Sequence, residues 1–429
     1  MKLKTIPVIG ALLLCACASQ TAAPEETSTD VQTQQESAAV TDGSQGEVTL
    51  TETQTETALT ETQTETTEQT TAASSETATE VPASRVPVFT YDYSENRVTA
   101  DDDPDRTLYI GTRKAVSFPD AGNYPQLENA VNSLMQEIDE FSQQVEKDYI
   151  ESANELYAND DALFNEYDLC LTLTEEVSVI RCDEDIFSFV VMVDEFGGGV
   201  HNFWSYTAYN YRVSDGTLIS LDDLTPDKQG VRKAVAEKLT TKYDPEIFWQ
   251  ESADATLAET YGEDLCGYTS YSEDGEPWEH GAMNFVLTPT GVVFFSNIYD
   301  ITYFAAGQQS AELSFDEFPD LINGEYAPKG DEYSLYLRDD NVLNHALLKT
   351  EFGTKDVVIN SVFGEREDGD YGFVNFEVRV DGEAHTIDID YPEGDTSICY
   401  ITARIDHTPD SDTIHIFDFK GNELCSQAL

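Results

Sequence analysis

Basic side chains are scarce in this sequence. Its 429 residues contain 23 Lys and Arg against 83 Asp and Glu, which gives a formal net charge of −60 at pH 7. Nucleic-acid binding needs a basic face that displaces the counterions of the phosphates, so this composition argues against it. It argues equally against adhesion to anionic lipid headgroups. A cationic protein is the partner that the charge favours.

Long apolar runs are also missing. The only candidate, residues 6–14, is too short to span a bilayer of about 30 Å as a helix. It follows two lysines, which is typical of a signal peptide. Ala16 before Cys17, with Leu14 three positions before that cysteine, resembles the bacterial lipoprotein box. We therefore expect a lipoprotein signal peptide at 1–16, lipidation at Cys17 and a place on the outer face of the cell membrane. A plain secretory signal is the alternative.

Residues 17–84 have almost nothing to bury. Positions 18–84 hold 13 acidic residues and no Lys or Arg, and the octet LTETQTET occurs at 50–57 and again at 59–66. Such a segment cannot offset the entropy of folding, and its like charges repel, so we expect a disordered Thr/Glu/Gln-rich tether. The remaining residues, 85–429, still carry 70 acidic against 21 basic side chains.

Cysteines are few, and their use stays open. Of seven, Cys15 would leave with the signal peptide, Cys17 would be lipidated, and five would remain. An exported protein permits disulfides. The candidate bridges are Cys170 with Cys182 and Cys399 with Cys425. Cys266 would be left over, so free thiols are the alternative.

The sequence offers little for catalysis. None of its six histidines has the His-x-x-x-His or His-Glu-x-x-His spacing of a zinc hydrolase. It has no Gly-x-Ser-x-Gly elbow, and its acidic runs lack the twelve-residue calcium loop. We therefore expect no metal, no cofactor and no enzymatic activity.

A helix followed by strands is the pattern of residues 85–328. Apolar residues recur with steps of three and four from 127 to 149, which predicts an amphipathic helix of about eight turns. Strand-like runs follow at 169–180, 186–193, 203–213, 218–221, 284–287, 292–295 and 311–315. The prediction is an α+β domain, in which one long amphipathic helix packs on an antiparallel sheet.

Residues 331–429 are predicted to form a smaller, mostly β C-terminal domain. Pro328, Lys329 and Gly330 form a plausible hinge. Strand-like runs follow at 357–362, 373–380, 386–389, 398–405 and 413–419.

Two sets of short motifs carry a family resemblance. The first is FGGGVHN at 196–202, followed by YNY at 209–211 and a turn at Asp215-Gly216. The second is NFVL at 284–287, followed by YDI at 299–301 and YFAAG at 303–307. In this order, and after a long helix, they are similar to the extracellular domain of anti-sigma-V factors of the RsiV type. The same modules occur as accessory domains of peptidoglycan deacetylases. The resemblance covers about 85–325.

The resemblance implies binding rather than catalysis. In the anti-sigma members this domain senses and binds lysozyme, a cationic protein that suits an acidic receptor. This chain shows no transmembrane helix through which binding outside the cell could be signalled to the cytoplasm. We expect a surface lipoprotein that binds a lysozyme-like cationic protein or peptidoglycan glycan. A structural or accessory lipoprotein without a soluble ligand is the alternative, and a cell-wall hydrolase or deacetylase has the least support.

The candidate ligand-binding residues come from both motif sets. They are Gly198, Gly199, His201, Asn202, Tyr299, Tyr303 and Gly307. The glycines would let a partner approach closely, while the histidine and asparagine offer donors and acceptors. Alternatively, the glycines permit a bulge and the aromatics pack the long helix. The aromatic residues at 203–211 could likewise be exposed on one face or buried on both.

Overall fold

The computed structural model describes residues 86–119, 123–159, 161–272, 275–330, 332–338, 344–350, 353–365, 371–387 and 402–429. These residues belong to one compact unit. The predicted signal peptide and tether, with Cys17, lie outside the described residues, and so does Cys399.

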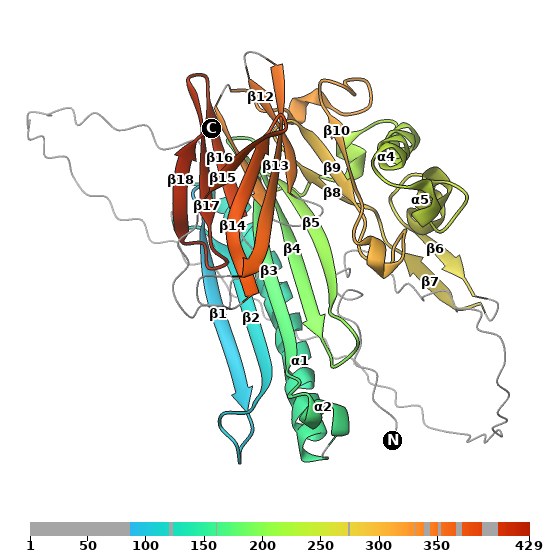
Figure 1. The fold of residues 1–429 in the computed structure, drawn as a ribbon. Coiled ribbons are helices and arrows are strands. Elements are labelled where there is room, and N and C mark those ends of the chain that lie inside the picture. Colours follow the sequence, from blue (N-terminus) through green and yellow to red (C-terminus); the bar gives the residue numbers. More distant parts are fainter. Residues whose placement is uncertain are drawn as a thin grey trace, which may run out of the picture. The chain divides into compact units, whose positions relative to one another are not determined.

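A curled nine-stranded sheet dominates the fold (Figure 1). Its strand order is β1-β2-β3-β11-β16-β17-β18, and β4 and β5 branch from β3. Every pair is antiparallel except β2 with β3, for which α1 is the connection. The strands are β1 (Thr90–Thr99), β2 (Thr107–Ser117), β3 (Leu171–Cys182), β4 (Ile186–Phe196), β5 (Phe203–Arg212), β11 (Tyr333–Arg338), β16 (Thr402–Thr408), β17 (Ser411–Phe417) and β18 (Glu423–Ala428).

Three smaller sheets accompany it. They are β8 (Asn284–Leu287) with β9 (Gly291–Phe295) and β10 (Ser310–Ser314), the hairpin β6 (Tyr268–Tyr271) with β7 (Pro277–His280), and β12 (His345–Thr350), β13 (Gly353–Glu365), β14 (Tyr371–Val380) and β15 (Glu383–Ile387). The helices are α1 (Pro125–Ala158), α2 (Ala162–Glu166), α3 (Leu221–Leu224), α4 (Lys228–Lys242) and α5 (Ala253–Tyr261), with 3-10 turns η2 (Pro245–Ile247), η3 (Phe304–Ala306) and η4 (Gly324–Tyr326). The fold is thus mixed α and β, mostly β, with few helices.

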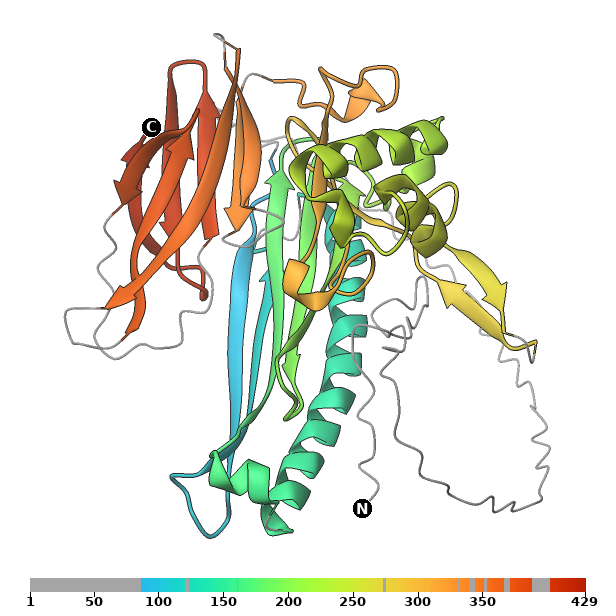
Figure 2. The same ribbon diagram turned by 45° about the vertical axis from the view of Figure 1, so that its right-hand side comes forward.

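The helix α1 lies along β2 and β3 and covers one face of the long strands (Figure 2). Pro125 is its first residue, where a missing N–H costs nothing. The apolar positions of the predicted period face the core: Leu134 and Phe141 are partly buried, and the buried ones are Leu127, Val131, Ile138, Val145 and Tyr149. Its first turn meets the hairpin after β5, where a Cβ on Gly216 would lie 2.4 Å from the carbonyl oxygen of Gln126. Only glycine fits there.

The main sheet forks beside β3. Along one edge, β3 pairs with β2 up to Glu176 and then with β11 at Arg181. The fork encloses a fully buried ion cluster, in which Glu176 accepts a hydrogen bond from Lys114 at 3.0 Å and forms an ion pair with Arg338 at 3.1 Å. The hydroxyl of Tyr91 accepts the backbone N–H of Val179 at 3.0 Å, which satisfies a donor exposed by the fork. We call Lys114, Glu176 and Arg338 the fork cluster.

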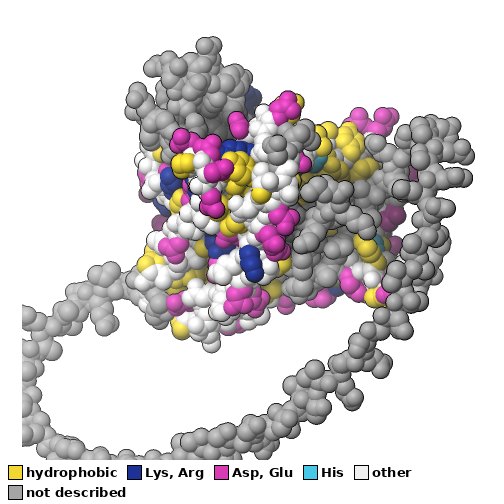
Figure 3. Space-filling view, turned by 90° about the horizontal axis from the view of Figure 1, so that it is seen from below, with side chains coloured by type: hydrophobic (Ala, Val, Ile, Leu, Met, Phe, Trp, Pro, Cys, Tyr) yellow, Lys and Arg dark blue, Asp and Glu magenta, His cyan; other side chains and the backbone are white. Residues whose placement is uncertain are grey.

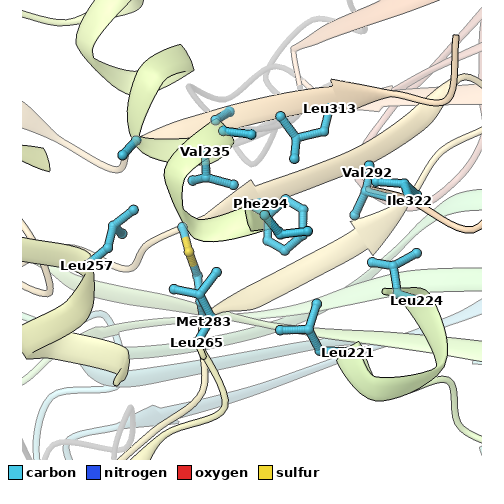
Figure 4. Packing of buried hydrophobic residues seen from close by; sticks show 14 of the residues in the cluster. Leu221, Leu224, Val235, Leu257, Leu265, Met283, Val292, Phe294, Leu313 and Ile322 are labelled. Atoms are coloured by element: carbon cyan, nitrogen blue, oxygen red, sulfur yellow. The ribbon is translucent and has the colours of Figure 1, made fainter. Parts of the chain in front are cut away.

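A second core lies between α3, α4, α5 and the sheet β8–β10. Phe294 of β9 is central, and Val235, Leu257 and Leu313 surround it (Figure 4). Asp227 begins α4 by accepting the N–H of Gly230 with its carboxylate, which is a standard helix cap. This core supports the segment between β9 and β10.

Along the edge of β5 that faces away from β4, side-chain amides form hydrogen bonds with the backbone. Asn297 accepts the N–H of Tyr206 at 2.7 Å and donates to its carbonyl at 3.1 Å, as a neighbouring strand would. Asn284 accepts from Ala208 and also donates to the Tyr206 carbonyl. In return, the amide of Asn210 bonds the backbone of β8. We call these three asparagines the amide seam; they join β5 to β8 and to the loop after β9.

The C-terminal part differs from the prediction. β11 and β16–β18 continue the main sheet, and only β12–β15 form a sheet of their own. Residues 331–429 are therefore not the independent domain that a hinge at 328–330 would delimit. The pairing of β11 with β3 joins residues far apart in the sequence, which no local pattern reveals.

The predicted bridge between Cys170 and Cys182 is wrong. Cys170 lies just before β3 and Cys182 ends it, so the whole strand separates the two sulfurs. Both are free thiols, and Cys266 and Cys425 are also free. Burial raises the pKa of the Cys182 thiol strongly, so it behaves as a core residue rather than as a reactive one.

Candidate functional site: an exposed aromatic cluster

The fold brings the two motif sets together. The loop 197–202 connects β4 to β5, and residues 299–307 lie between β9 and β10. The imidazole of His201 stacks on the ring of Phe304, with centroids 3.6 Å apart. The hydroxyl of Tyr299 lies 3.4 Å from Nε2 of His201. Residues almost a hundred positions apart therefore form one surface.

Two tryptophans extend this surface. Trp204, the second residue of β5, meets Phe304 edge to face at 5.2 Å. The indole N–H of Trp249, which follows η2, donates to the carbonyl of Tyr299 at 3.4 Å. Tyr303 directly precedes Phe304 and is 46% exposed, while Trp249 is 39% exposed. The aromatic cluster is the set His201, Trp204, Trp249, Tyr299, Tyr303 and Phe304.

Strained backbone positions the cluster. Tyr299 has φ +68°, the left-handed conformation that an aromatic residue rarely adopts. The next residue holds this turn, because the carboxylate of Asp300 accepts the N–H of Asn297 at 2.9 Å and the hydroxyl of Tyr261 at 2.8 Å. Gly307 also has a positive φ and donates its N–H to Phe304 at the end of η3. Strain of this kind concentrates at ligand sites.

The glycine loop has a more modest role. Gly198 has φ +87° and needs to be glycine, but a Cβ on Gly197 or Gly199 would meet nothing closer than 3.7 Å. His201 bonds the carbonyl of its neighbour at 2.7 Å, and Asn202 donates to Asp194 at 3.3 Å. Asn202 thus ties the loop to β4, and His201 alone of the loop joins the aromatic cluster.

Three other aromatic residues of β5 are buried, and together they lie on both faces of the strand. Tyr209 and Tyr211 pack in the core beneath α1, and Tyr206 packs on the opposite face against Phe295. The alternative of burial on both faces is correct for these three residues. Trp204 is partly exposed because it lies where β5 begins.

The electrostatics of this region are one-sided. Residues 243–328 contain 17 Asp and Glu and no Lys or Arg. Four of the six cluster residues lie within this stretch. Of the other two, His201 lies on the loop 197–202, and Trp204 lies on β5 opposite Asp194. On the face shown in Figure 3, Asp and Glu side chains are spread over the described part of the molecule. A count of basic residues along the sequence is enough to locate this stretch.

Asp300 is the buried acid beneath the cluster. Burial raises the pKa of its carboxyl, against two hydrogen bonds that favour the ionised form. Burial also raises the pKa of the Tyr261 hydroxyl, which donates to it. The Tyr261 hydroxyl therefore keeps its proton and donates it in the hydrogen bond to Asp300 that fixes the turn at Tyr299.

Two findings bear on other classes of site. Among the described residues, no group of three or more His, Cys, Asp and Glu is placed to hold a metal ion. No helix of the described part is long and apolar enough to cross a membrane.

The sequence did not indicate Trp249. It lies fifty residues before Tyr299, and no motif included it. Phe304 belonged to a motif but not to the candidate residues, although its ring is the centre of the cluster. Contacts between distant loops were needed to find both.

No family model and no curated protein matches the chain. The solved structures that are similar to it include two proteins of one family. One is a member of the DUF3298 family from Bacteroides fragilis, with 18% identity and a TM-score of 0.41 over 56% of this chain and 96% of that chain. The other is a DUF3298 family protein from Pseudomonas aeruginosa, with 14% identity and a TM-score of 0.35 over 57% and 98%. Both are distant similarities.

Proposed function

We propose that this protein is a non-catalytic surface lipoprotein of the bacterial envelope that binds a basic protein, of the lysozyme kind, through the aromatic cluster. The observation that carries the proposal is that four of the six cluster residues lie within 86 consecutive residues that contain no Lys or Arg. Buried aromatic anchors and complementary charge are what specific interfaces combine.

Each part of the surface has a role in this proposal. Tyr303 and Trp249 offer exposed apolar area at a low entropic cost, because aromatic side chains have few rotatable bonds. The acidic surroundings would speed encounter with a cationic partner and disfavour anionic ones. The strained turn at Tyr299 would keep the anchors ordered before the partner arrives, which reduces the entropy lost on binding.

The test is calorimetric titration of the protein with lysozyme at about 150 mM and about 500 mM salt, where the Debye length falls to about 4–5 Å. We expect a stoichiometric complex that persists at the higher salt. Tyr303→Ala should weaken it about tenfold or more, the size expected of an interface anchor. Tyr271→Ala, at a tyrosine that is 72% exposed outside the cluster, is the matched control and should bind as the wild type does.

Two results would favour the other hypotheses. Heat of binding that disappears at high salt, or is equal in both variants, would indicate nonspecific charge attraction and leave an accessory lipoprotein as the better account. Binding of soluble peptidoglycan fragments that Tyr303→Ala abolishes, without any lysozyme complex, would assign the same surface to glycan, since aromatic faces also stack on sugar rings.

A further inference from the structure

An amine and a thiol meet at the start of α4. Lys228 is the first residue of α4, and Cys266 lies in the turn between α5 and β6. The distance from Nζ of Lys228 to Sγ of Cys266 is 3.3 Å. The two residues are 38 positions apart, so the fold, and not the local sequence, places them together.

The turn around Cys266 is held from several sides. Leu265 and Gly267 both have a positive φ, of +60° and +78°. The N–H of Gly267 donates to the carbonyl of Tyr261 at 2.8 Å, and that of Met283 donates to Leu265 at 3.0 Å. A Cβ on Gly267 would lie 2.3 Å from the carbonyl oxygen of His280, so only glycine fits at this position of the turn. The thiol is therefore fixed against the amine.

Carboxylates surround the amine. Asp222 lies 2.6 Å and Asp264 3.7 Å from Nζ of Lys228. The side chain of Lys228 is 22% exposed and Cys266 is half-buried, so a small oxidant can reach both. The hydrogen bond to Asp222 raises the pKa of Lys228, so the amine enters any reaction as an ammonium ion.

We propose that Lys228 and Cys266 form a covalent N–O–S bridge with molecular oxygen as the oxidant. The ammonium, the thiol and one O₂ give Lys–NH–O–S–Cys, one water and one proton. The N–H and S–H bonds break and N–O and S–O bonds form. Sulfur and nitrogen lose two electrons each, and the four electrons reduce O₂ to the bridging oxygen and the oxygen of water.

The surroundings favour this product over a disulfide. Burial raises the pKa of the Cys266 thiol, so little thiolate is present to exchange with external disulfides. None of the other cysteines in the described residues lies in this turn. The amine of Lys228 is therefore the group that lies in position to react with the sulfur of Cys266.

The bridge would tie two elements together. Lys228 begins α4, and Cys266 precedes the hairpin β6–β7, which pairs with no other strand among those described. A covalent link at this point would fix the base of the hairpin to the helical core and would be released by reductants.

The experiment compares aerobically stored full-length protein with the same protein treated with dithiothreitol. Because residues 243–328 contain no tryptic site, a glutamate-specific protease is used, which frees Cys266 in a short peptide from 264 to 273. We expect a cross-linked peptide pair whose mass exceeds the sum of the two peptides by one oxygen less two hydrogens. Dithiothreitol should separate the pair and restore alkylation of Cys266.

The matched control is Lys228→Arg, which keeps the positive charge beside Asp222 but offers no amine. In this variant Cys266 should be fully alkylated after the same storage. The proposal is overturned if wild-type Cys266 is alkylated as completely as in Lys228→Arg. It is also overturned if the loss of alkylation reflects only a sulfinic acid or a mixed disulfide on the single peptide.

Discussion

Tyr299 combines an exposed ring with an unfavourable backbone conformation, and the two effects can be separated. Tyr299→Ala and Tyr299→Gly both remove the ring, but only glycine adopts φ +68° without strain. We expect the Gly variant to be more stable than the Ala variant by about 1 kcal/mol in urea denaturation.

Both Tyr299 variants should bind the partner equally weakly in the calorimetric titration, because the cluster has lost the same ring in each. Binding that survives in either variant would show that Tyr299 contributes only to the fold. We expect both variants to lose affinity, because the ring of Tyr299 contacts Phe304 and His201 within the cluster.

Glu176 shares a buried site with two cations. Its side chain, like those of Lys114 and Arg338, has no exposed area. Burial opposes the ionised form of Glu176, but Arg338 and Lys114 outweigh it and lower its pKa. Glu176→Gln would remove the carboxylate that both buried cations share, so we expect a loss of about 3–5 kcal/mol in the free energy of unfolding.

The control for Glu176 is Glu95→Gln at an exposed ion pair with Arg97. Such pairs contribute about 0–1 kcal/mol, so this variant should unfold at nearly the wild-type denaturant concentration. Equal effects of the two substitutions in chemical denaturation would contradict the assignment of the fork cluster as a buried, coupled site.

At the level of the element, the amide seam replaces a missing strand. Asn297→Ala would remove the acceptor for the N–H of Tyr206 and one of the two donors to its carbonyl. The other donor, the amide of Asn284, would remain. We expect a cost of about 1–3 kcal/mol, as for one unsatisfied buried donor. Hydrogen exchange should show the amide of Tyr206 exchanging much faster, while the amide of Ala208, bonded to Asn284, remains protected. Unchanged exchange at Tyr206 would mean that the seam does not hold this edge.

Elements with a strong apolar period were visible in the sequence. The steps of three and four from 127 to 149 lie within α1, and the strand-like runs at 186–193 and 284–287 lie within β4 and β8. β1 and β2 were not predicted. β1 is an edge strand whose residues are mostly exposed or half-buried, so it lacks the alternation that marks a strand.

The candidate site was only partly predictable for a related reason. Motifs identify residues such as His201 and Tyr303, but a surface is defined by contacts between loops. That His201 stacks on Phe304, and that Trp249 bonds Tyr299, follows from tertiary structure alone. The unpaired thiols show the same limit, since the spacing of Cys170 and Cys182 did not reveal the strand between them.

At the scale of the whole molecule, acidification should stabilise this protein. Burial raises the pKa of Asp300, Glu312 and Glu175 above their unfolded values. A carboxyl with a raised folded pKa contributes stability that is complete below its unfolded pKa, 3.8 for Asp and 4.5 for Glu, and that is lost as pH rises through the folded pKa. Lowering the pH also protonates part of the excess acidic side chains, which reduces their mutual repulsion and stabilises the fold further.

We therefore expect the melting temperature to rise as pH is lowered from about 7.5 to about 5. Asp300→Asn keeps the acceptor for Tyr261 and should make this rise smaller. Glu176 opposes the trend only at lower pH, because its lowered pKa means that its contribution is lost as pH falls through the folded value. A melting temperature that stays level or decreases over this window would contradict the prediction.

The fork in the sheet also sets an order in time. During synthesis, β3 leaves the ribosome long before β11, since Arg338 follows Ser178 by 160 residues. Until β11 arrives, Glu176 has the ion pair with Lys114 but lacks the one with Arg338, and the far half of one edge of β3 is open. About the first three-quarters of the described residues can therefore collapse early, but the interior closes only when the remaining quarter has been made. A chain truncated before β11 would expose that edge to any passing strand, so chaperone demand and proteolysis should peak at this point of translation.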